Sequence, residues 1–444
     1  MKLLLIKNAK LVNEGEIYQA NLIVKNGLID SIHRDTIPEH TEAEVIDARG
    51  LYLLPGVIDD QVHFREPGLT HKGDLASESA AAAAGGVTSF MEMPNTNPQT
   101  ITLEELEKKF ELAENKSVVN FSFYLGATND NLTQVKKVNP LQVCGVKVFM
   151  GASTGNMLVD NKKTLEGIFA EAPLLIATHC EDEATIKANT ERFKQSYGDS
   201  IPVEYHAEIR NAESCYKSSS LAVELASRYG SQLHILHLST LQEMSLLESG
   251  PVTEKKITGE VCVHHLWFNN SDYKRLGSLI KWNPAIKSAA DQQGLWDGLL
   301  ANKLDVIATD HAPHTLEEKA NPYTKSPSGG PLVQHSLVAM LECYQRGKIS
   351  LERVVEKMCH APADLYRIKG RGYLRPGYKA DLVLVDLNRK WKVSKENILY
   401  KCGWSPFDGV DFNSKVICTL VNGKIVYQDD KIVQRAGERL EFNR

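Results

Sequence analysis

Short apolar runs rich in β-branched residues recur through the middle of the chain, and segments of helical composition separate them. Such runs, bounded by turn residues, are typical of buried strands. Eight of them are predicted to be strands, beginning at Val57, Val87, Val119, Val143, Pro173, Gln232, Ile257 and Leu304. The clearest helical stretches begin at Leu103, Ser219 and Asp291.

The order of these elements predicts an α/β fold. Strands that are apolar along their whole length belong to parallel sheets with both faces covered. Eight of them, alternating with helices over about 250 to 300 residues, predict a (β/α)8 barrel of the TIM type. A doubly wound open sheet is the structural alternative.

The two ends of the chain have a different pattern. Both contain short strands broken by Gly, Asn and Asp turns, as in the segments KNGLIDSI and VNGKIVYQDDKIV. We therefore expect a small β-sandwich-like domain built from residues 1–55 and 366–444, and a barrel over residues 56–365.

Composition narrows the class of partner. The chain has 444 residues, of which 42% are hydrophobic and 24% are charged, and its net charge of −5 includes no long block of one sign. This argues against a nucleic-acid surface or a membrane-binding patch and leaves a small molecule as the expected partner.

The expected location is the cytoplasm. The apolar run before Lys7 is too short for a secretory signal, and no stretch reaches the roughly 20 apolar residues that a bilayer span requires. The 8 cysteines are scattered without a C-x-x-C motif, so they predict buried reduced thiols rather than disulfides or a thiolate zinc site.

Candidate chemistry gathers at the ends of the predicted strands. The carboxyl ends of barrel strands face the mouth where active sites form. A single histidine there is more often a hydrogen-bonded core residue, and a single aspartate is often a helix cap. Several ligand types on one rim instead predict a shared metal centre. The residues are His63, Lys147, His179, His237 and Asp310.

Two positions in this set are unusual. Residues 61 and 63 point to the same side of a strand and could share a metal, but Gln61 stands where a second histidine would be the stronger ligand. Lys147 cannot bind a cation as an ammonium. Either it forms a salt bridge with Asp310 or Glu92, or it is carboxylated by CO₂ to a carbamate that bridges two metals.

Taken in order, the segments DDQVHFREPG, GVKVFMGASTG, THCED, HILHLST, KWNPAIK and ATDHAPH resemble the amidohydrolase superfamily, and within it the dihydroorotases of the long bacterial type. The terminal segment KADLVLVD resembles the β domain of the same proteins. The resemblance implies a zinc hydrolase that reversibly converts L-dihydroorotate to N-carbamoyl-L-aspartate in de novo pyrimidine biosynthesis, and it implies a homodimer.

The resemblance also implies a ligand set for each metal. The first zinc would use His63, Lys147 and Asp310, and the second would use Lys147, His179 and His237. Asp160 is an alternative bridging residue, because some relatives use an aspartate. Since the amide of Gln61 is a weaker ligand than imidazole, we expect one firmly bound Zn²⁺ at the second position and a weaker or absent ion at the first.

Further roles follow from the same resemblance. Asp310 would act as general base and then acid. The predicted substrate-binding residues are Arg65, Asn95, Asn283 and His314. Arg65 is suited to a carboxylate through paired hydrogen bonds, and its alternative is a salt bridge with Glu66. The two asparagines could instead be turn residues.

Three further segments bear on the site. Lys287 stands where relatives commonly have a carboxylate-binding arginine. The pair His264 and His265 is expected to be structural, because adjacent strand residues point in opposite directions. The segment LEEKANPYTKSPSGGP from Leu316 is expected to be a loop over the mouth and a possible lid.

Two alternatives to the dihydroorotase hypothesis stay open. Another cyclic amidase, of the allantoinase or dihydropyrimidinase type, would share the metal ligands but not a substrate carboxylate. A non-catalytic homologue that binds or scaffolds a partner protein is a different class, and the glutamine at position 61 is the feature that favours it.

Overall fold

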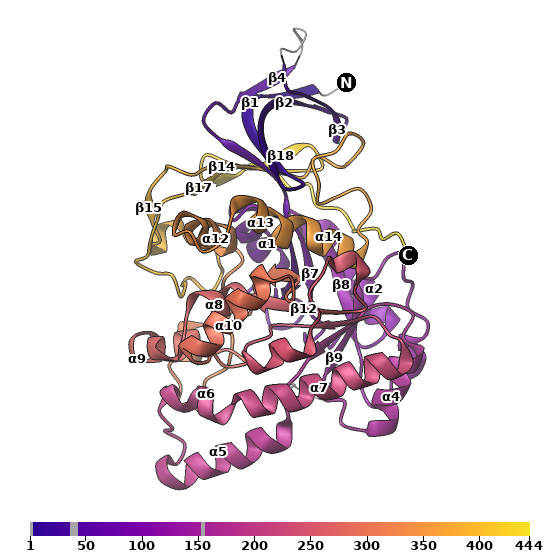
Figure 1. The fold of residues 1–444 in the computed structure, drawn as a ribbon, viewed down its shortest axis with the longest axis vertical. Helices are drawn as coiled ribbons and strands as arrows, with labels where there is room; N and C mark the ends of the chain where they lie inside the picture. Colours follow the sequence, from indigo (N-terminus) through magenta and orange to yellow (C-terminus); the bar gives the residue numbers. More distant parts are fainter. Residues whose placement is uncertain (1–2, 36–42, 152–155) are drawn as a thin grey trace.

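The computed structural model describes residues 3–35, 43–151 and 156–444, and Figure 1 shows their arrangement. Eight strands form a parallel sheet in chain order. They are β6 (Val57–Val62), β7 (Val87–Glu92), β8 (Asn120–Gly126), β9 (Gly145–Phe149), β10 (Ile176–His179), β11 (Leu233–Ile235), β12 (Ile257–Cys262) and β13 (Val306–Ala308). A parallel bridge between Val62 and His311 joins the first strand to the segment after the last, and the amide of His63 donates to the carbonyl of His311 at 2.7 Å.

These eight strands are the ones that the hydrophobic pattern predicts, and the (β/α)8 class is confirmed. The main helices of the barrel are α1 (Leu75–Ala84), α2 (Leu103–Lys116), α4 (Lys162–Glu171), α5 (Glu183–Tyr197), α7 (Ala212–Tyr229), α10 (Ala289–Leu300) and α12 (Ser336–Gln345). Shorter α-helices are α3 (Leu132–Val135), α6 (His206–Ile209), α8 (Val263–Trp267), α9 (Tyr273–Leu276), α11 (Leu316–Lys319), α13 (Leu351–Val355) and α14 (Ala361–Tyr366). A π-helical turn spans Glu356–His360.

Helix α2 illustrates how the sequence positions the outer layer. The Thr102 side chain accepts a hydrogen bond from the amide of Glu105 and caps the helix. Leu106, Phe110 and Ala113 recur at helical spacing and are buried. The Phe110 ring packs edge-on against Phe123 of β8 with centroids 4.9 Å apart, so this face of the helix covers the barrel wall.

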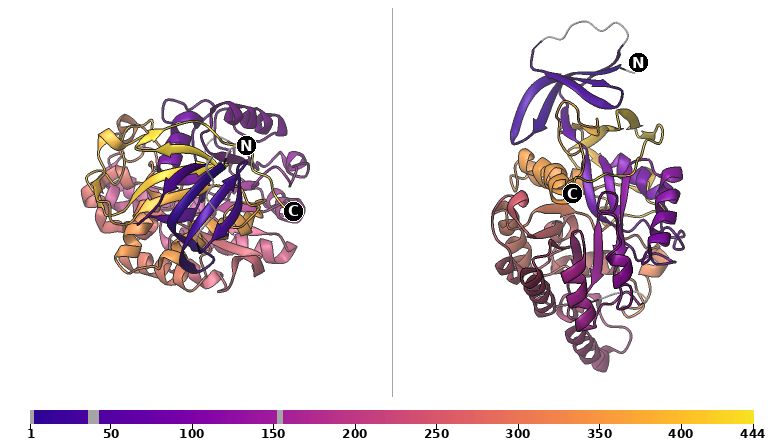
Figure 2. Two further views of the ribbon diagram at one scale, coloured as in Figure 1. Left: turned by 90° about the horizontal axis from the view of Figure 1, so that it is seen from above. Right: turned by 90° about the vertical axis from the view of Figure 1, so that its right-hand side faces the viewer.

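Both termini contribute to a second, nine-stranded sheet. Its strands are β1 (Leu3–Asn13), β2 (Glu16–Lys25), β3 (Leu28–His33), β4 (Glu44–Asp47), β5 (Tyr52–Pro55), β14 (Leu382–Asp386), β17 (Lys415–Val421), β18 (Lys424–Gln428) and β19 (Lys431–Ile432). A separate ribbon pairs β15 (Trp391–Lys392) with β16 (Asp411–Phe412). The terminal strands lie together at one end of the molecule (Figure 2), and the exact boundaries predicted between the two units stay a prediction.

Buried polar groups connect the two sheets. Asp381 of the C-terminal segment accepts hydrogen bonds from the side chain of Asn120 on β8 at 3.1 Å and from the amide of Asn422 at 2.7 Å, and it forms an ion pair with Arg371. These contacts fix the terminal sheet on the barrel. Among the described residues, no helix is both long enough and apolar enough to cross a membrane.

One local expectation is wrong. The predicted strand ITGEVCVHHL ends at Cys262, and the residues after it form helix α8. His264 and His265 therefore do not point in opposite directions: their ring centroids are 4.1 Å apart. The His264 ring stacks on Trp282 with centroids 4.5 Å apart.

Candidate active site

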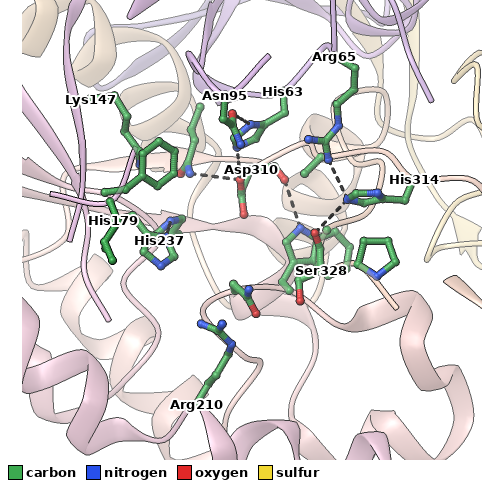
Figure 3. Close-up of a pocket in the computed structure, with 18 of the residues that line it drawn as sticks. His63, Arg65, Asn95, Lys147, His179, Arg210, His237, Asp310, His314 and Ser328 are labelled. Carbon is green, nitrogen blue, oxygen red and sulfur yellow. Dashed lines mark hydrogen bonds and ion pairs between the residues drawn. The ribbon is translucent and has the colours of Figure 1, made fainter. Parts of the chain in front are cut away.

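A cavity of about 480 Å³ opens at the carboxyl ends of the barrel strands. Figure 3 shows the side chains that converge on it. All ten residues proposed from the sequence line this cavity: Gln61, His63, Arg65, Asn95, Lys147, His179, His237, Asn283, Asp310 and His314. The structure brings them together from strand ends far apart in the sequence, while their individual roles stay predictions.

One pair of candidate metal ligands lies at His63 and Asp310. The His63 Nδ1 lies 2.7 Å from Asn95 Oδ1 and donates to it, so the lone pair of the imidazole is on Nε2. That atom lies 3.2 Å from Asp310 Oδ1. The side-chain amide nitrogen of Gln61 also donates to Asp310 Oδ1 at 3.2 Å, so the glutamine nitrogen, whose lone pair is delocalised into the carbonyl, faces this position.

A second pair lies at His179 and His237. The His179 Nε2 donates to Glu181 Oε2 at 3.0 Å, which leaves a lone pair on Nδ1. This atom is 3.0 Å from His237 Nε2. Glu181 also forms an ion pair with Arg210, which lines the cavity.

The donor atoms fit zinc. Two nitrogen or oxygen ligands at about 2.0–2.1 Å from a tetrahedral Zn²⁺ lie about 3.3 Å from each other. The separations of 3.2 Å in the first pair and 3.0 Å in the second are close to this value. Each of His63 and His179 donates its other ring nitrogen to an oxygen acceptor, as metal-ligating histidines usually do.

Lys147 is a buried amine that lines the same cavity as the two pairs (Figure 3). Neither predicted salt bridge is found among the described residues: Glu92 pairs with Lys109 at 3.1 Å, and the Lys147 Nζ lies 4.7 Å from the centre of the Phe149 ring. Burial lowers the pKa of Lys147 to about 8. A substantial neutral fraction of the amine is therefore present at neutral pH, which carboxylation by CO₂ requires.

Asp160, the alternative bridging residue, does not line the cavity. Its carboxylate is exposed and accepts a hydrogen bond from Asn129 at 2.9 Å. Residues 152–155 lie outside the described residues. The position of Asp160 therefore favours Lys147 as the bridging candidate.

Burial sets the charge of the remaining groups. It raises the pKa of Asp310 to about 7 and lowers the pKa of His63 and His237 well below the usual value of histidine. Neutral imidazoles are the form that binds metal.

The backbone is also unusual here, because Arg65, His237 and Asp310 have φ angles of 72°, 39° and 47°. A non-glycine residue in this region costs about 1–3 kcal/mol, and such residues cluster at functional sites.

Arg65 and His314 form the other side of the cavity. The Arg65 Nε donates to the carbonyl of Pro313 at 3.1 Å, and Nη2 lies 3.0 Å from His314 Nε2, which also lies 3.1 Å from the carbonyl of Ser328. The alternative partner Glu66 instead pairs with Lys116. Burial lowers the pKa of Arg65 to about 10, so the guanidinium is charged at neutral pH.

The two asparagines differ. The Asn95 Oδ1 accepts the hydrogen bond from His63 Nδ1, so Asn95 orients the imidazole of a candidate ligand. The Asn283 Oδ1 is buried and has no hydrogen-bond partner among the described residues, which leaves it available to a bound molecule. Lys287 is buried and donates to Ser239 Oγ at 3.2 Å, and it does not line the cavity.

Several residues of the site were missed by the sequence argument. They are Phe149, Leu158, Glu183, Arg210, Trp282, Ala312 and the loop residues 327–329. Glu181, which holds His179, had a local signal because it follows that histidine by two residues, whereas Arg210 had none. The loop after Leu316 does reach the mouth, with Pro327, Ser328 and Gly329 in the cavity wall.

Comparison with known proteins agrees with this geometry. The model of the Amidohydrolase family matches residues 52–426. The chain belongs to the amidohydrolase family. Among its relatives are a dihydroorotase from Methanosarcina mazei, 33% identical over 97% of this chain and 96% of the relative, and one from Pyrococcus abyssi, 30% identical over 99% and 98%.

Solved structures of the family share the whole fold. An L-hydantoinase (dihydropyrimidinase) from Arthrobacter aurescens superimposes with a TM-score of 0.92 at 28% identity, covering 99% of this chain and 100% of that one. A dihydropyrimidinase from Brevibacillus agri gives a TM-score of 0.88 at 26% identity and covers all of both chains. The resemblance noted in the sequence is thereby confirmed.

Proposed function

We propose that this amidohydrolase is a dihydroorotase, which reversibly hydrolyses the ring amide of L-dihydroorotate to N-carbamoyl-L-aspartate in pyrimidine synthesis. Relatives named dihydroorotase match almost the whole chain at 30–33% identity. The observation that carries the proposal is the Arg65 guanidinium beside the candidate metal ligands. A guanidinium pairs with a planar carboxylate through two hydrogen bonds, and the ring of dihydroorotate carries such a carboxylate.

The proposed cofactor is zinc. The second position would use His179, His237 and a carboxylated Lys147, and the first would use His63, Asp310 and the same lysine. When bound, Zn²⁺ lowers the pKa of its water from 15.7 to about 7 and polarises a carbonyl. We expect the second position to hold its ion more firmly, because the glutamine nitrogen faces the first.

The chain's own groups would perform the proton transfers. The Asp310 carboxylate points into the cavity (Figure 3) and is placed to accept a proton from the attacking water. It would then give that proton to the departing ring nitrogen, acting as general base and then acid. Asp310→Asn should lower kcat by at least about 100-fold, and near-normal turnover with bound zinc would refute this role.

Substrate binding would use both sides of the cavity. Arg65 and His314 would hold the carboxylate, and the unpartnered Asn283 Oδ1 would accept a hydrogen bond from a ring N–H. Arg210, although paired with Glu181, would offer its remaining N–H donors on the opposite side (Figure 3). This arrangement suits an anionic substrate whose product carries a second carboxylate.

A second candidate function is that of the dihydropyrimidinases, because solved proteins of that name share the fold. Their substrates lack the carboxylate. Arg65→Gln separates the two functions: it should raise the KM for dihydroorotate and lower kcat/KM by about 100-fold or more, since it removes a charged hydrogen-bond pair. The exposed Arg34→Gln variant serves as the control. An unchanged KM for dihydroorotate in Arg65→Gln would contradict the proposal.

A further inference from the structure

His237 lacks the hydrogen bond that orients the imidazoles of His63 and His179. His63 is held by Asn95 and His179 by Glu181 through their free ring nitrogens. The corresponding Nδ1 of His237 is buried and has no hydrogen-bond partner among the described residues. Its ring orientation must therefore be set in another way.

The backbone of His237 supplies that control. Its φ angle of 39° lies in the left-handed region, which a non-glycine residue adopts only when its surroundings hold it there. The amide of His237 donates to Glu260 Oε1 at 3.0 Å. Glu260 is fully buried on β12, and the same oxygen accepts from the thiol of Cys262 at 3.3 Å.

Glu260 faces a buried imidazole deeper in the barrel. The imidazole of His234 on β11 lies 3.7 Å from Glu260 Oε2 and 3.3 Å from Asp60 Oδ2, counted from its Nε2. All three side chains have no solvent exposure. The phenol of Tyr366 donates to the same Asp60 oxygen at 2.9 Å and completes the cluster.

The hydrogen bonds determine how His234 is protonated. The Thr258 hydroxyl donates to the carbonyl of Leu233 at 3.1 Å, so its oxygen accepts from His234 Nδ1 at 2.8 Å. Nδ1 therefore carries a proton. Because Nε2 faces two carboxylates, a neutral ring would direct its lone pair at negative oxygens, whereas a second proton on Nε2 makes the contact attractive.

We propose that Asp60, His234 and Glu260 form a buried charge cluster that positions His237 for metal binding, with Glu260 as the positioning residue. The cluster sits on the barrel floor and acts on His237 through its backbone amide. It explains why the motif HILHLST contains two histidines three residues apart: one would bind metal and the other would hold the carboxylate that orients the first. The inference rests on the proposed zinc site but not on the identity of the substrate.

The test is the affinity for zinc of Glu260→Gln. This variant keeps the size of the side chain and removes the charge that holds it against His234. Loss of a residue that orients a metal ligand costs about 10- to 100-fold in metal affinity, so we expect the more firmly bound zinc to weaken by that factor in chelator competition. Glu260→Asp, which keeps the charge but withdraws the oxygen from the amide, should act in the same direction.

Asp305→Asn is a matched control. Asp305 is buried, accepts a hydrogen bond from the backbone amide of Gly259 at the same distance of 3.0 Å, and pairs with Lys255. It contacts none of the candidate ligands. The control variant should keep the zinc affinity of the wild type even if its thermal stability falls as much as that of Glu260→Gln.

The outcomes separate the proposals. Equal zinc affinity in the wild type and both Glu260 variants would overturn the positioning role while leaving the proposed function intact. A wild type that binds no zinc would overturn both.

Asp60, His234 and Glu260 are also ligand types that could hold a metal. Firm zinc that persists in a His179→Ala, His237→Ala double variant and disappears on adding His234→Gln would show that the cluster is itself a metal site, which would overturn the positioning role.

Discussion

The predicted inequality of the two metal positions rests on Gln61. This residue directs its amide nitrogen toward Asp310 and its oxygen toward Cys262 Sγ, 3.9 Å away. Since imidazole is the better zinc ligand, Gln61→His should tighten the weaker position. We expect the wild type to release one zinc readily and retain another in a chelator titration, and Gln61→His to retain both.

The exposed Gln142→His variant tests whether any added histidine has this effect, and it should leave the titration unchanged. Two equally tight zinc ions in the wild type would contradict this account of residue 61.

At the same scale, the sequence predicts ligands better than their supports. The place of His63, His179 and Asp310 in the cavity could be predicted because they are ligand types at the ends of barrel strands, where the fold itself determines the direction of the side chain, while their ligand roles stay predictions. Glu260 and Arg210 could not be predicted in this way. Their roles depend on contacts between strands and helices that are distant in the sequence, and a carboxylate within a strand has no local feature that marks it.

At the scale of the element, the loop after Leu316 differs from a free lid. The Lys319 amine is buried and donates to the carbonyls of Pro327 and Gly329, each at 2.9 Å. A neighbouring buried amine, that of Lys281, donates to the carbonyl of Tyr323 at 2.8 Å. These bonds hold the loop as a fixed wall of the cavity, which composition alone could not show.

Lys319→Met should loosen this wall. It removes the hydrogen bonds of a buried amine and leaves buried carbonyls without partners, so we expect about 1–3 kcal/mol less stability, faster amide hydrogen exchange over residues 323–329 and a raised KM. Lys325→Met, an exposed lysine of the same loop, is the control. Equal exchange in the two variants would show that Lys319 does not anchor the loop.

Helix α8 shows where element prediction failed. The stretch VCVHHL continues the apolar, β-branched pattern of β12, so the pattern predicted a longer strand. The chain instead turns into a helix after Cys262, and His264 stacks on Trp282 at the wall of the cavity. The stacking of these two rings is a tertiary contact, which local periodicity does not encode. The hydrophobic pattern therefore could not predict the turn from strand to helix.

At the scale of the whole molecule, stability should depend on pH through the buried cluster. Burial alone would lower the pKa of His234, but Asp60 and Glu260 outweigh it and raise the pKa to about 9. A histidine whose folded pKa exceeds its unfolded value stabilises the fold fully below about pH 6.5 and loses this contribution as pH rises through about 9. The contribution is about 3 kcal/mol.

The expected result is a difference between two pH profiles. Between pH 7 and 9, the free energy of unfolding of the metal-free wild type should fall relative to that of His234→Gln by about 2 kcal/mol, because part of the full contribution is already lost at pH 7 and part remains at pH 9. Urea unfolding at several pH values measures it. Parallel profiles would mean that His234 is neutral in the folded chain.

The central claim is that this cavity binds a cyclic amide with a carboxylate and hydrolyses it. The most direct test is the kcat/KM of the purified, zinc-supplied chain for dihydroorotate, dihydrouracil and allantoin under the same conditions. Of the three substrates, only dihydroorotate carries a carboxylate for Arg65 and His314 to bind. We therefore predict a kcat/KM for dihydroorotate at least about 100-fold higher than for the other two. Faster turnover of dihydrouracil or allantoin, or no turnover of any of the three with zinc bound, would contradict the account.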